Sequence, residues 1–390
     1  MSFYLSSNPD ETHIRACTIR LWINHGHPIM AEVVKAIWDA EVEAYPHDRI
    51  IDSIHVTSCD EFFRGFEHAS HSELEPLDIS PSGYVEWALD FATKHGINTV
   101  FPGRYADELI QASDRFKAIG VTLLHTASLT EKTVLGDRPA LYRRLQECFH
   151  GDIVPDFYTW QDDHKISLEA VVAMVQSTKN NPSPRHRSVC VMPAVGKVSK
   201  GFFQFTESRD PQQQLEHPEK RVIGVSEFSQ IAHSLSIQNK TSRQWVLMEY
   251  MEGVTYSVDC LAWHGRVVAH VIREKQGAHG HVTTENEFLL RQVNIIARDF
   301  GLSGVFNAKF LVDSHGRLRL LSANPRFFGG LGMSTLAGVN LPWLWLKMHH
   351  GDGMWEKRMP SASLGVRVDS VLCSVQLPSA SYSHQAELSG

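Results

Sequence analysis

The stretch FNAKFLVDSHGRLRLLSANPRFFGG, residues 306–330, holds the pattern that decides the fold. Two apolar runs enclose the polar triplet SHG at 314–316, which is typical of a β-hairpin. The second run ends in Asn324 and Arg326, and Gly329 and Gly330 follow, where the missing side chains permit close backbone approach. The amide oxygen of Asn324 suits a magnesium ion, and the guanidinium of Arg326 suits a carboxylate or an acyl phosphate. The segment therefore predicts a hairpin that delivers polar groups to a site.

Two lobes of mixed α+β structure precede and include this hairpin. A smaller lobe with an antiparallel sheet is predicted from VPDFYTW, SLEAVVAMVQST, VCVMPAV, FFQFTE, EFSQIAHSLS and QWVLMEYM, residues 154–251. The second lobe is predicted from the hairpin TYSVDCLAWHGRVVAHVIRE, the helix NEFLLRQVNIIARDFGL and the opening hairpin, residues 255–326. The fold class of this part is therefore α+β.

The amino-terminal part has a different order, in which strands alternate with helices. The strand-like runs are ACTIRLWIN, IIDSIHVTS, NTVFPGR and VTLLHT, separated by helical patterns such as MAEVVKAIWDAEVEA. Such alternation predicts an α/β domain with a parallel sheet. Arg104 and Glu108 follow a strand at its carboxyl end, where such folds place ligands, but an ordinary pair at a helix start explains them equally well.

These patterns divide the chain into five parts. The predicted divisions are 1–126 for the amino-terminal α/β domain, 127–150 for a helical connector, 151–248 for the first lobe, 249–358 for the second and 359–390 for a tail with one strand-like piece.

Composition excludes several classes of protein. The chain has 390 residues and a net charge of −7, with no basic block, so nucleic acid is not an expected partner. It has no apolar run long enough to span a membrane, and the start lacks a secretory pattern, so we expect a cytoplasmic protein. The six scattered cysteines predict neither disulfides nor a CxxC zinc site. Histidine-containing loops at 25–27 and 278–281 leave a zinc alternative open, although solvated loop histidines explain them better.

Six segments, taken in order, resemble the ATP-grasp superfamily. They are GDRPALYRRL (136–145), VCVMPAVGKVSKGFF (189–203), VLMEYMEG (246–253), TYSVD (255–259), IREK (272–275) and KFLVDSHGRLRLLSANPRFFGGLGMSTLAGVNLP (309–342). Together with the amino-terminal domain, they resemble carboxylate-amine ligases and carbamoyl-phosphate-synthetase-like proteins. The resemblance implies a pre-ATP-grasp domain followed by a two-lobed ATP-grasp domain, with ATP and magnesium as cofactors.

The resemblance also implies roles for individual residues. Nucleotide binding falls on Arg138, Met192, Lys197, Lys200, Glu249, Tyr250, Met251 and Thr255, and metal binding falls on Asn324. The lysines lie in a glycine-containing loop that can fold over phosphates, and the backbone at 249–251 would bond the adenine edge. The implied catalytic residues are Arg273, Arg326 and Lys309, whose charges would stabilise the transferred phosphoryl group and the intermediate.

Several positions depart from the superfamily pattern. Lys309 and Ser322 stand where acidic magnesium ligands are usual, Met192 replaces a lysine, and Thr255 replaces a glutamate. Lys309 could neutralise the phosphates in place of a metal. Two functions stay open: a ligase that joins a carboxylate to an amine through an acyl phosphate, and an inactive protein that serves as a binding, scaffold or regulatory partner. The ligase would take small-molecule substrates, and a homodimer or a protein partner is open for both.

Overall fold

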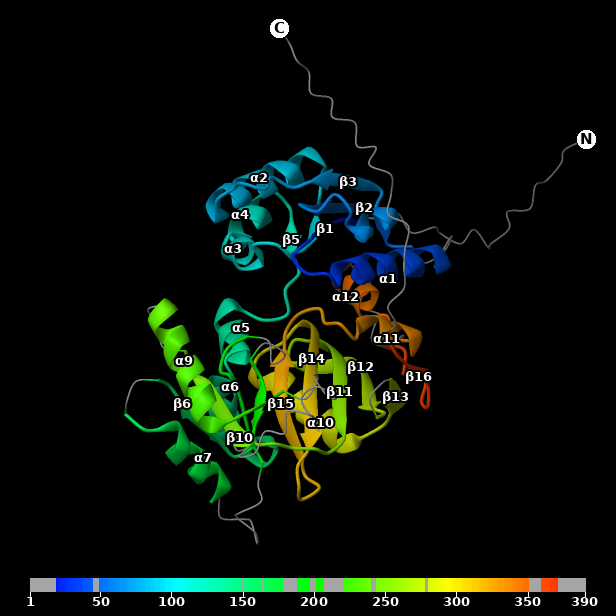
Figure 1. The fold of residues 1–390 in the computed structure, drawn as a ribbon. Coiled ribbons are helices and arrows are strands. Elements are labelled where there is room, and N and C mark those ends of the chain that lie inside the picture. The colour runs from blue at the N-terminus through cyan, green and yellow to red at the C-terminus, as the bar shows by residue number, and fades with distance from the viewer. Residues whose placement is uncertain are drawn as a thin grey trace, which may run out of the picture.

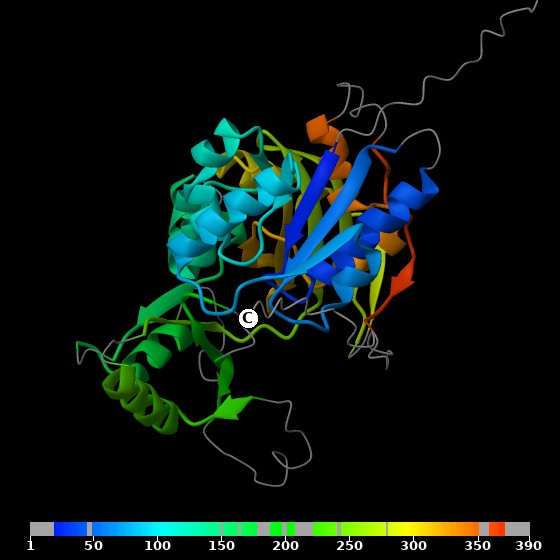
Figure 2. The same ribbon diagram turned by 90° about the horizontal axis from the view of Figure 1, so that it is seen from above.

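The computed structural model describes residues 19–44, 49–148, 151–162, 165–177, 188–196, 201–206, 221–239, 243–277, 280–350 and 359–370. Within these ranges the chain forms three sheets. Figure 1 shows the amino-terminal sheet above a large central sheet, with the smaller third sheet beside the central one. The view from above in Figure 2 shows that this smaller unit projects to one side of the other two.

The amino-terminal sheet is parallel throughout, in the order β3-β2-β1-β4-β5. Its strands are β1 (Ile19–Asn24), β2 (Ile51–Ser58), β3 (His71–Leu74), β4 (Thr99–Phe101) and β5 (Thr122–Leu123). Its helices are α1 (Met30–Glu43), the 3-10 helix η1 (Arg64–His68), α2 (Pro81–Lys94), α3 (Ala106–Gln111) and α4 (Ser113–Ala118). Leu21 and Ile23 pack toward α1, while Trp22 packs toward α2. Apolar residues on both faces of β1 therefore give the predicted doubly covered parallel sheet.

The connector consists of α5 (Leu129–Gly136), α6 (Arg138–Glu147) and the 3-10 helix η2 (Gly151–Ile153). Ser128 caps α5 by accepting from the backbone N–H of Glu131, and Asp137 caps α6 by accepting from that of Ala140. These caps satisfy backbone donors that a helix start leaves free, so the two short helices have defined beginnings.

The smaller lobe has the strand order β6-β10-β7-β8-β9. Its elements are β6 (Phe157–Trp160), α7 (Leu168–Gln176), β7 (Val189–Pro193), β8 (Phe203–Phe205), β9 (Val222–Ile223), α9 (Val225–Asn239) and β10 (Trp245–Glu249). The sheet is antiparallel as predicted except at one edge, where β8 and β9 are parallel. The connection from 206 to 221 has the length that a parallel crossover requires.

The central sheet has the order β15-β14-β11-β12-β13-β16 and is antiparallel. Its strands are β11 (Thr255–Trp263), β12 (Arg266–Lys275), β13 (His281–Thr284), β14 (Gly304–Val312), β15 (Leu318–Asn324) and β16 (Arg367–Val368). Its helices are α10 (Glu287–Asp299), α11 (Leu331–Leu336) and α12 (Leu341–His350). His264 and Gly265, both with positive φ, form the tight β11–β12 turn. Of the predicted tail strand, β16 holds only the beginning, and residues 371–390 lie outside the described ranges.

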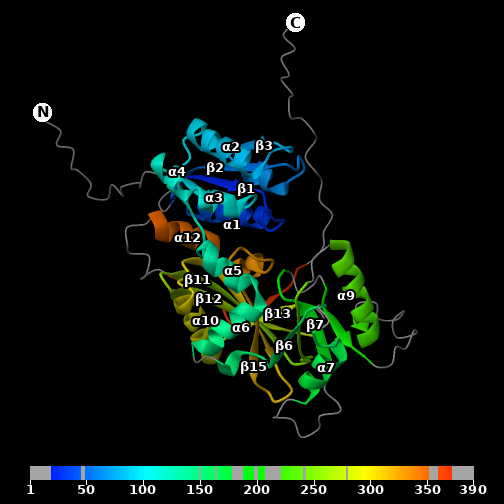
Figure 3. The same cartoon turned by 90° about the vertical axis from the view of Figure 1, so that its left-hand side faces the viewer.

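The amino-terminal domain and the central lobe share one hydrophobic core. The smaller lobe has a core of its own on one face of its sheet, and the other face shares a cluster with the connector and the central lobe. Figure 3 shows α12 between the amino-terminal sheet and the central sheet. The ring of Trp345 on α12 lies 5.1 Å from that of Phe101 on β4. Asn340 Nδ2 donates to the carbonyl oxygen of Ala36 on α1 at 2.7 Å. These contacts join two of the three units into one packed body.

Candidate active site

One face of the central sheet carries polar side chains in two rows. The strand register aligns Ser322, Lys309, Ser257, Arg273 and Thr283 across five adjacent strands. Because alternate residues of a strand share a face, Asn324, Asn307 and Asp259 form a second row two residues away. The predicted hairpin thus brings Lys309 beside Ser322.

Arg273 is held by a buried network on this face. Its guanidinium donates to both carboxylate oxygens of Asp259, from Nε at 2.7 Å and from Nη2 at 3.0 Å. Asn307 Nδ2 and the Ser334 hydroxyl donate to the same carboxylate at 2.7 and 2.6 Å. The Arg273 side chain is 4% exposed and that of Asp259 is fully buried. The bidentate pair therefore fixes the orientation of Arg273.

Gly330 makes room for this guanidinium. A Cβ atom at position 330 would lie 2.1 Å from Nη2 and 2.7 Å from Cζ of Arg273. The neighbouring Gly329 has no atom within 4 Å of the same position. The sequence had suggested close approach at both glycines, but among the two only Gly330 lies against another group.

Lys309 lies next to two other cations. Burial, Arg273 and Lys275 lower the pKa of the Lys309 ammonium, and Asp259 raises it. Part of the Lys309 side chain nevertheless remains exposed. A repelled, partly desolvated ammonium gains free energy from an anion, so this end of the face is suited to a negatively charged ligand.

The nucleotide side of the predicted site is occupied by protein contacts at two positions. Arg138 Nη1 donates to the carbonyl oxygen of Pro193 at 2.7 Å, and Nη2 donates to that of Gly196 at 2.9 Å. Met192 is 2% exposed and packs in the same core cluster as Met251. Arg138 therefore ties α6 to the end of β7, where residues 197–200 begin.

The strand β10 continues into the connection between the lobes. Leu247 and Met248 pair with β7, and the N–H of Tyr250 extends the ladder by donating to Ser188 O at 2.8 Å. Glu249 and Tyr250 are half-buried. Gly253 crosses close to β14, since a Cβ there would lie 2.3 Å from the carbonyl oxygen of Val312. The connection is thus anchored on both lobes.

Thr255 begins β11 and pairs with Leu311 on β14, on the polar face that also carries Ser257. Asn324 ends β15, and its Nδ2 donates to the Ser322 hydroxyl at 3.3 Å. Lys197 and Lys200 lie outside the described residues. Thr255, Lys309 and Asn324 are therefore positioned on one face of the sheet.

Arg326 lines a cavity of about 210 Å³ between the amino-terminal domain and the central lobe. The cavity is lined by Gly26, His27, Ile29, Met30, Phe101, Pro102, Gly103, Ala106, Ile110, Leu124, His125, Thr126, Ala127, Lys132, Pro325, Arg326, Phe327 and Trp345. Its amino-terminal walls come from the carboxyl ends of β1 and β4, where an α/β sheet commonly binds ligands. Arg326 Nη1 donates to the carbonyl oxygen of Phe327 at 3.0 Å, and the side chain is otherwise exposed.

Two of the glycines that line this cavity, Gly26 and Gly103, lie in direct backbone contact. A Cβ on Gly26 would lie 2.1 Å from the carbonyl carbon of Gly103, and one on Gly103 would lie 2.1 Å from the carbonyl oxygen of Asn24. The loops after β1 and β4 therefore touch backbone to backbone.

Arg104 has a different partner from the one that the sequence suggested. Its Nη1 donates to Glu75 Oε2 at 3.1 Å and to the carbonyl oxygen of Pro76 at 2.9 Å. Burial raises the pKa of Glu75, and hydrogen bonds from Thr57 and Arg104 lower it. Arg104 therefore holds the segment after β3, and a pair with Glu108 does not explain it.

Of the loop histidines, His25 has protein partners, whereas Nδ1 of His281 is buried and receives no hydrogen bond from the described residues. His25 Nδ1 lies 2.8 Å from the Ser58 hydroxyl, and its ring stacks on Phe63 at 3.9 Å. His281 stands on β13 opposite Lys275, and burial lowers its pKa. The sequence analysis did not single out Asp259, Asn307 or Ser334, although Asp259 and Ser334 lie in segments that resemble the superfamily. The alternation of β11 could have placed Asp259 on the face of Thr255.

Comparison with known proteins agrees with this geometry. The family described as "ATP-grasp in the biosynthetic pathway with Ter operon" matches residues 241–372, from the lobe connection through the central lobe. No curated protein matches the chain. Among solved structures, the biotin carboxylase domain of Hydrogenobacter thermophilus 2-oxoglutarate carboxylase superposes with a TM-score of 0.56 and 13% identity. The match covers 85% of this chain and 70% of that one, whose structure was solved as a dimer with MgADP and bicarbonate.

Two further structures share the fold. L-amino acid ligase from Bacillus licheniformis has a TM-score of 0.54 and 11% identity over 85% of this chain and 73% of that one. N5-carboxyaminoimidazole synthetase from Staphylococcus aureus, also solved with ADP, has a TM-score of 0.53 and 11% identity over 89% and 80%. Residues 241–372 therefore match an ATP-grasp family, and the chain has the ATP-grasp fold, with a pre-ATP-grasp domain ahead of the two grasp lobes. Among the described residues, no helix is long and apolar enough to cross a bilayer.

Proposed function

We propose that this chain is an ATP-dependent ligase that joins a small carboxylate to an amine through an acyl phosphate. The observation that carries the proposal is the cavity beside Arg326. Its walls are mainly apolar, with a guanidinium at one end, which suits a small molecule that has an apolar body and a carboxylate. Arg326 follows Asn324 by two residues, so the cavity adjoins the polar face of the central sheet.

The second element of the proposal is the cationic side of that face. Lys309 and Lys275 would bind the polyphosphate of ATP. Together with the buried Arg273, they would supply positive charge that offsets the negative charge developing during phosphoryl transfer. The carboxylate attacks the terminal phosphorus and ADP leaves. The amine nitrogen then attacks the acyl carbon, and phosphate leaves with loss of a proton from the amine. Arg326 would orient the carboxylate for both steps.

The donor set does not fit a magnesium ion held by the protein. Magnesium binds carboxylate and other hard oxygen ligands in near-octahedral geometry. Lys309 and Ser322 offer an ammonium and a hydroxyl at the two expected positions. The carboxylate of Asp259 on the same face is already bonded to Arg273, Asn307 and Ser334. We therefore assign no step to a protein-bound magnesium ion, and any magnesium would arrive with the nucleotide.

The test measures nucleotide binding before activity. Thermal denaturation of the full chain is followed with ATP and EDTA, then with ATP and magnesium, since a ligand of the native state raises the midpoint. We expect ATP to raise the thermal midpoint of the wild-type chain both with EDTA and with magnesium, and to raise that of Lys309→Met by a smaller amount. ADP release is then screened against mixtures of small carboxylates and amines. The ligase proposal requires release that depends on both substrates and is reduced at least tenfold in Arg326→Gln, with nucleotide stabilisation unchanged. Arg20→Gln, which removes an exposed pair with Asp52, is the control.

A second candidate is a protein that binds a partner without turnover. Arg138 and Met192 favour it, because the guanidinium of Arg138 is bonded to backbone carbonyls and Met192 is buried. Neither side chain then faces a phosphate. Stabilisation by ATP without ADP release in any mixture would favour this candidate, and no stabilisation at millimolar ATP would exclude the ligase.

A further inference from the structure

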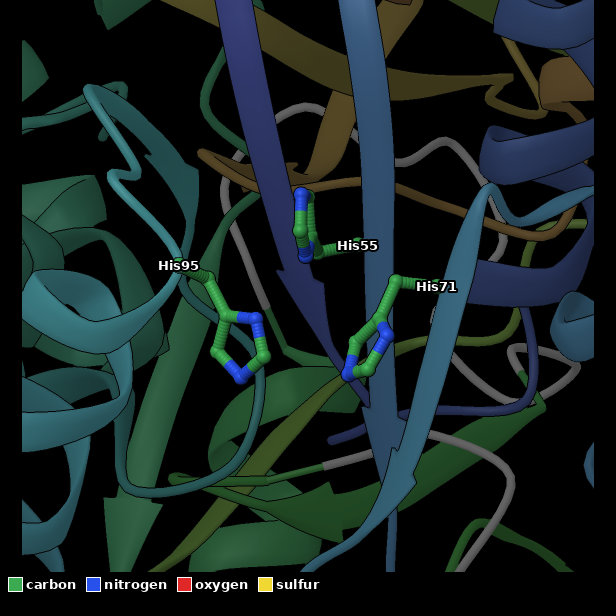
Figure 4. Close-up of side chains that lie close together, drawn as sticks. All are labelled: His55, His71 and His95. Carbon is green, nitrogen blue, oxygen red and sulfur yellow. The ribbon is translucent and has the colours of Figure 1, made fainter.

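Three histidines of the amino-terminal domain gather on the α2 side of the parallel sheet. His55 lies on β2, His71 begins β3, and His95 follows α2 directly. Figure 4 shows the three rings grouped around a common space, although they come from three separate elements. One nitrogen from each lies within 4.8 Å of those of the other two. Imidazole nitrogens from several elements in such a group are the donor set of a transition-metal site.

One buried ring nitrogen of each histidine lacks a hydrogen-bond partner among the described residues. His55 Nδ1, His71 Nε2 and His95 Nε2 are buried, and no hydrogen bond reaches them from the described part of the chain. The second nitrogen of His55, Nε2, lies 3.0 Å from the Ser53 hydroxyl. Buried polar atoms are normally paired, because each one left unpaired costs about 1–3 kcal/mol. A bound ion would satisfy all three, and Ser53 would orient His55 from behind as outer groups do in metal sites.

A carboxylate stands at the same place. Glu73 Oε2 lies 3.6 Å from Nε2 of His71 and 3.6 Å from Nε2 of His95, which is longer than a hydrogen bond. Lys94 Nζ also lies 3.6 Å from this oxygen. Three imidazoles and one carboxylate make four ligands, the number that zinc usually takes.

Burial favours the neutral form of two of these imidazoles. Burial, His71, His95 and Arg20 lower the pKa of His55 to about 4, and Asp52 raises it. Burial is also the first cause that lowers the pKa of His95. Both rings are therefore neutral near pH 7, with a lone pair available for coordination.

We propose that His55, His71, His95 and Glu73 form a site for zinc or a similar divalent transition metal. Bonds of about 2.0–2.1 Å place neighbouring ligand atoms roughly 3.4 Å apart around a tetrahedral ion. The present separations, up to 4.8 Å, close to that value through small side-chain rotations. The ion would be structural, since it joins the four-residue edge strand β3 to β2 and to the end of α2.

This position connects the metal to Arg104. Glu73 precedes Glu75 by two residues on the same stretch, and Glu75 holds Arg104 at the carboxyl end of the sheet. Fixing β3 would therefore fix the segment that positions Arg104. The inference is independent of the proposed ligase activity, because it concerns a different part of the domain.

The test uses the full chain without an affinity tag, stripped of metal by a chelator. We expect one equivalent of zinc to raise the thermal midpoint and to slow backbone hydrogen exchange in β3. Cobalt should give the visible absorption of a tetrahedral site. His71→Gln and His95→Gln should lose these three responses while folding at their own metal-free midpoints. His68→Gln, a histidine of the same domain that lies against Trp38 instead, should retain them.

Two results would overturn the inference. The first is a wild-type chain whose midpoint and β3 exchange do not respond to zinc, which would leave the histidines as neutral rings packed around Phe91. The second is a response that survives in both cluster variants, which would assign the bound metal to other histidines of this chain.

Discussion

The substitution Gly330→Ala should destabilise the central lobe because the new methyl group would displace the side chain of Arg273. The new Cβ would lie 2.1 Å from Nη2 of Arg273, so the guanidinium must move. Arg273 cannot move freely, because it is bonded twice to the buried carboxylate of Asp259. Losing one charge-assisted hydrogen bond costs about 1.5–3 kcal/mol, and breaking a buried pair costs about 3–5 kcal/mol. We expect a loss of about 2–4 kcal/mol.

The adjacent Gly329→Ala is a matched control. Its Cβ would meet no atom within 4 Å, and its φ lies outside the left-handed region, so we expect a change within about 0.5 kcal/mol. The assay is thermal and urea unfolding followed by tryptophan fluorescence. The midpoint of Gly330→Ala should fall by roughly 5–10 °C relative to Gly329→Ala.

A double-mutant cycle tests the cause. In the Arg273→Lys background, the Nη2 atom that the methyl group meets is absent, so Gly330→Ala should cost much less than in the wild type. Equal costs for Gly329→Ala and Gly330→Ala would refute the reasoning. Additive effects of Gly330→Ala and Arg273→Lys would show that the cost arises elsewhere.

Three other substitutions follow from the same structure. Burial would raise the pKa of the Asp313 carboxyl, but hydrogen bonds from the backbone of Arg317 and from other donors lower this pKa to about 2. The ionised carboxylate therefore stabilises the fold by about 2 kcal/mol above pH 4, and this stabilisation is lost as the pH falls through 2. Asp313→Asn should remove this part of the pH dependence of the free energy of unfolding, measured with urea. An unchanged dependence of that free energy on pH would contradict the prediction. Gly103→Ala, whose Cβ would lie 2.1 Å from the backbone oxygen of Asn24, should lower the midpoint by several degrees, and a wild-type midpoint would count against that contact. Gly136→Ala, with nothing within 4 Å and helical geometry, should instead raise stability by about 0.5 kcal/mol, and a loss in urea unfolding would disprove it.

The sequence predicts the long elements of the fold, but its apolar pattern does not mark some short strands at or near the sheet edges. β1, β2 and the β11–β12 hairpin are apolar or β-branched over most of their length, so their patterns stand out. The short strands β3 and β13, at and next to a sheet edge, read HSEL and HVTT, which have no apolar alternation. They form because a neighbouring strand offers unpaired backbone groups, and their own sequences do not record this.

The candidate site is predictable where a hairpin fixes the register. The sequence placed Lys309 and Ser322 at the two metal positions, and β14 and β15 bring them opposite one another. The partner of Arg273 was not predictable, because Asp259 lies diagonal to it and Ser257 lies directly opposite. His55, His71 and His95 are far apart in sequence and meet only through the parallel packing of β2, β3 and α2. Loop spacing therefore drew attention to other histidines.

The helix α12 has a consequence for how the protein can be divided. Its residues Leu341, Trp345 and Met348 belong to the core that also holds β1 and α1. A fragment that begins at residue 127 would expose the apolar surface of α12 to water. A fragment that ends at residue 126 would lack α12 and would expose the apolar surface of the amino-terminal domain that α12 covers. The cavity loops therefore cannot be exchanged with a relative as a cassette of the first 126 residues. Any ligand preference of the cavity has to be transplanted, or to evolve, together with residues 325–350.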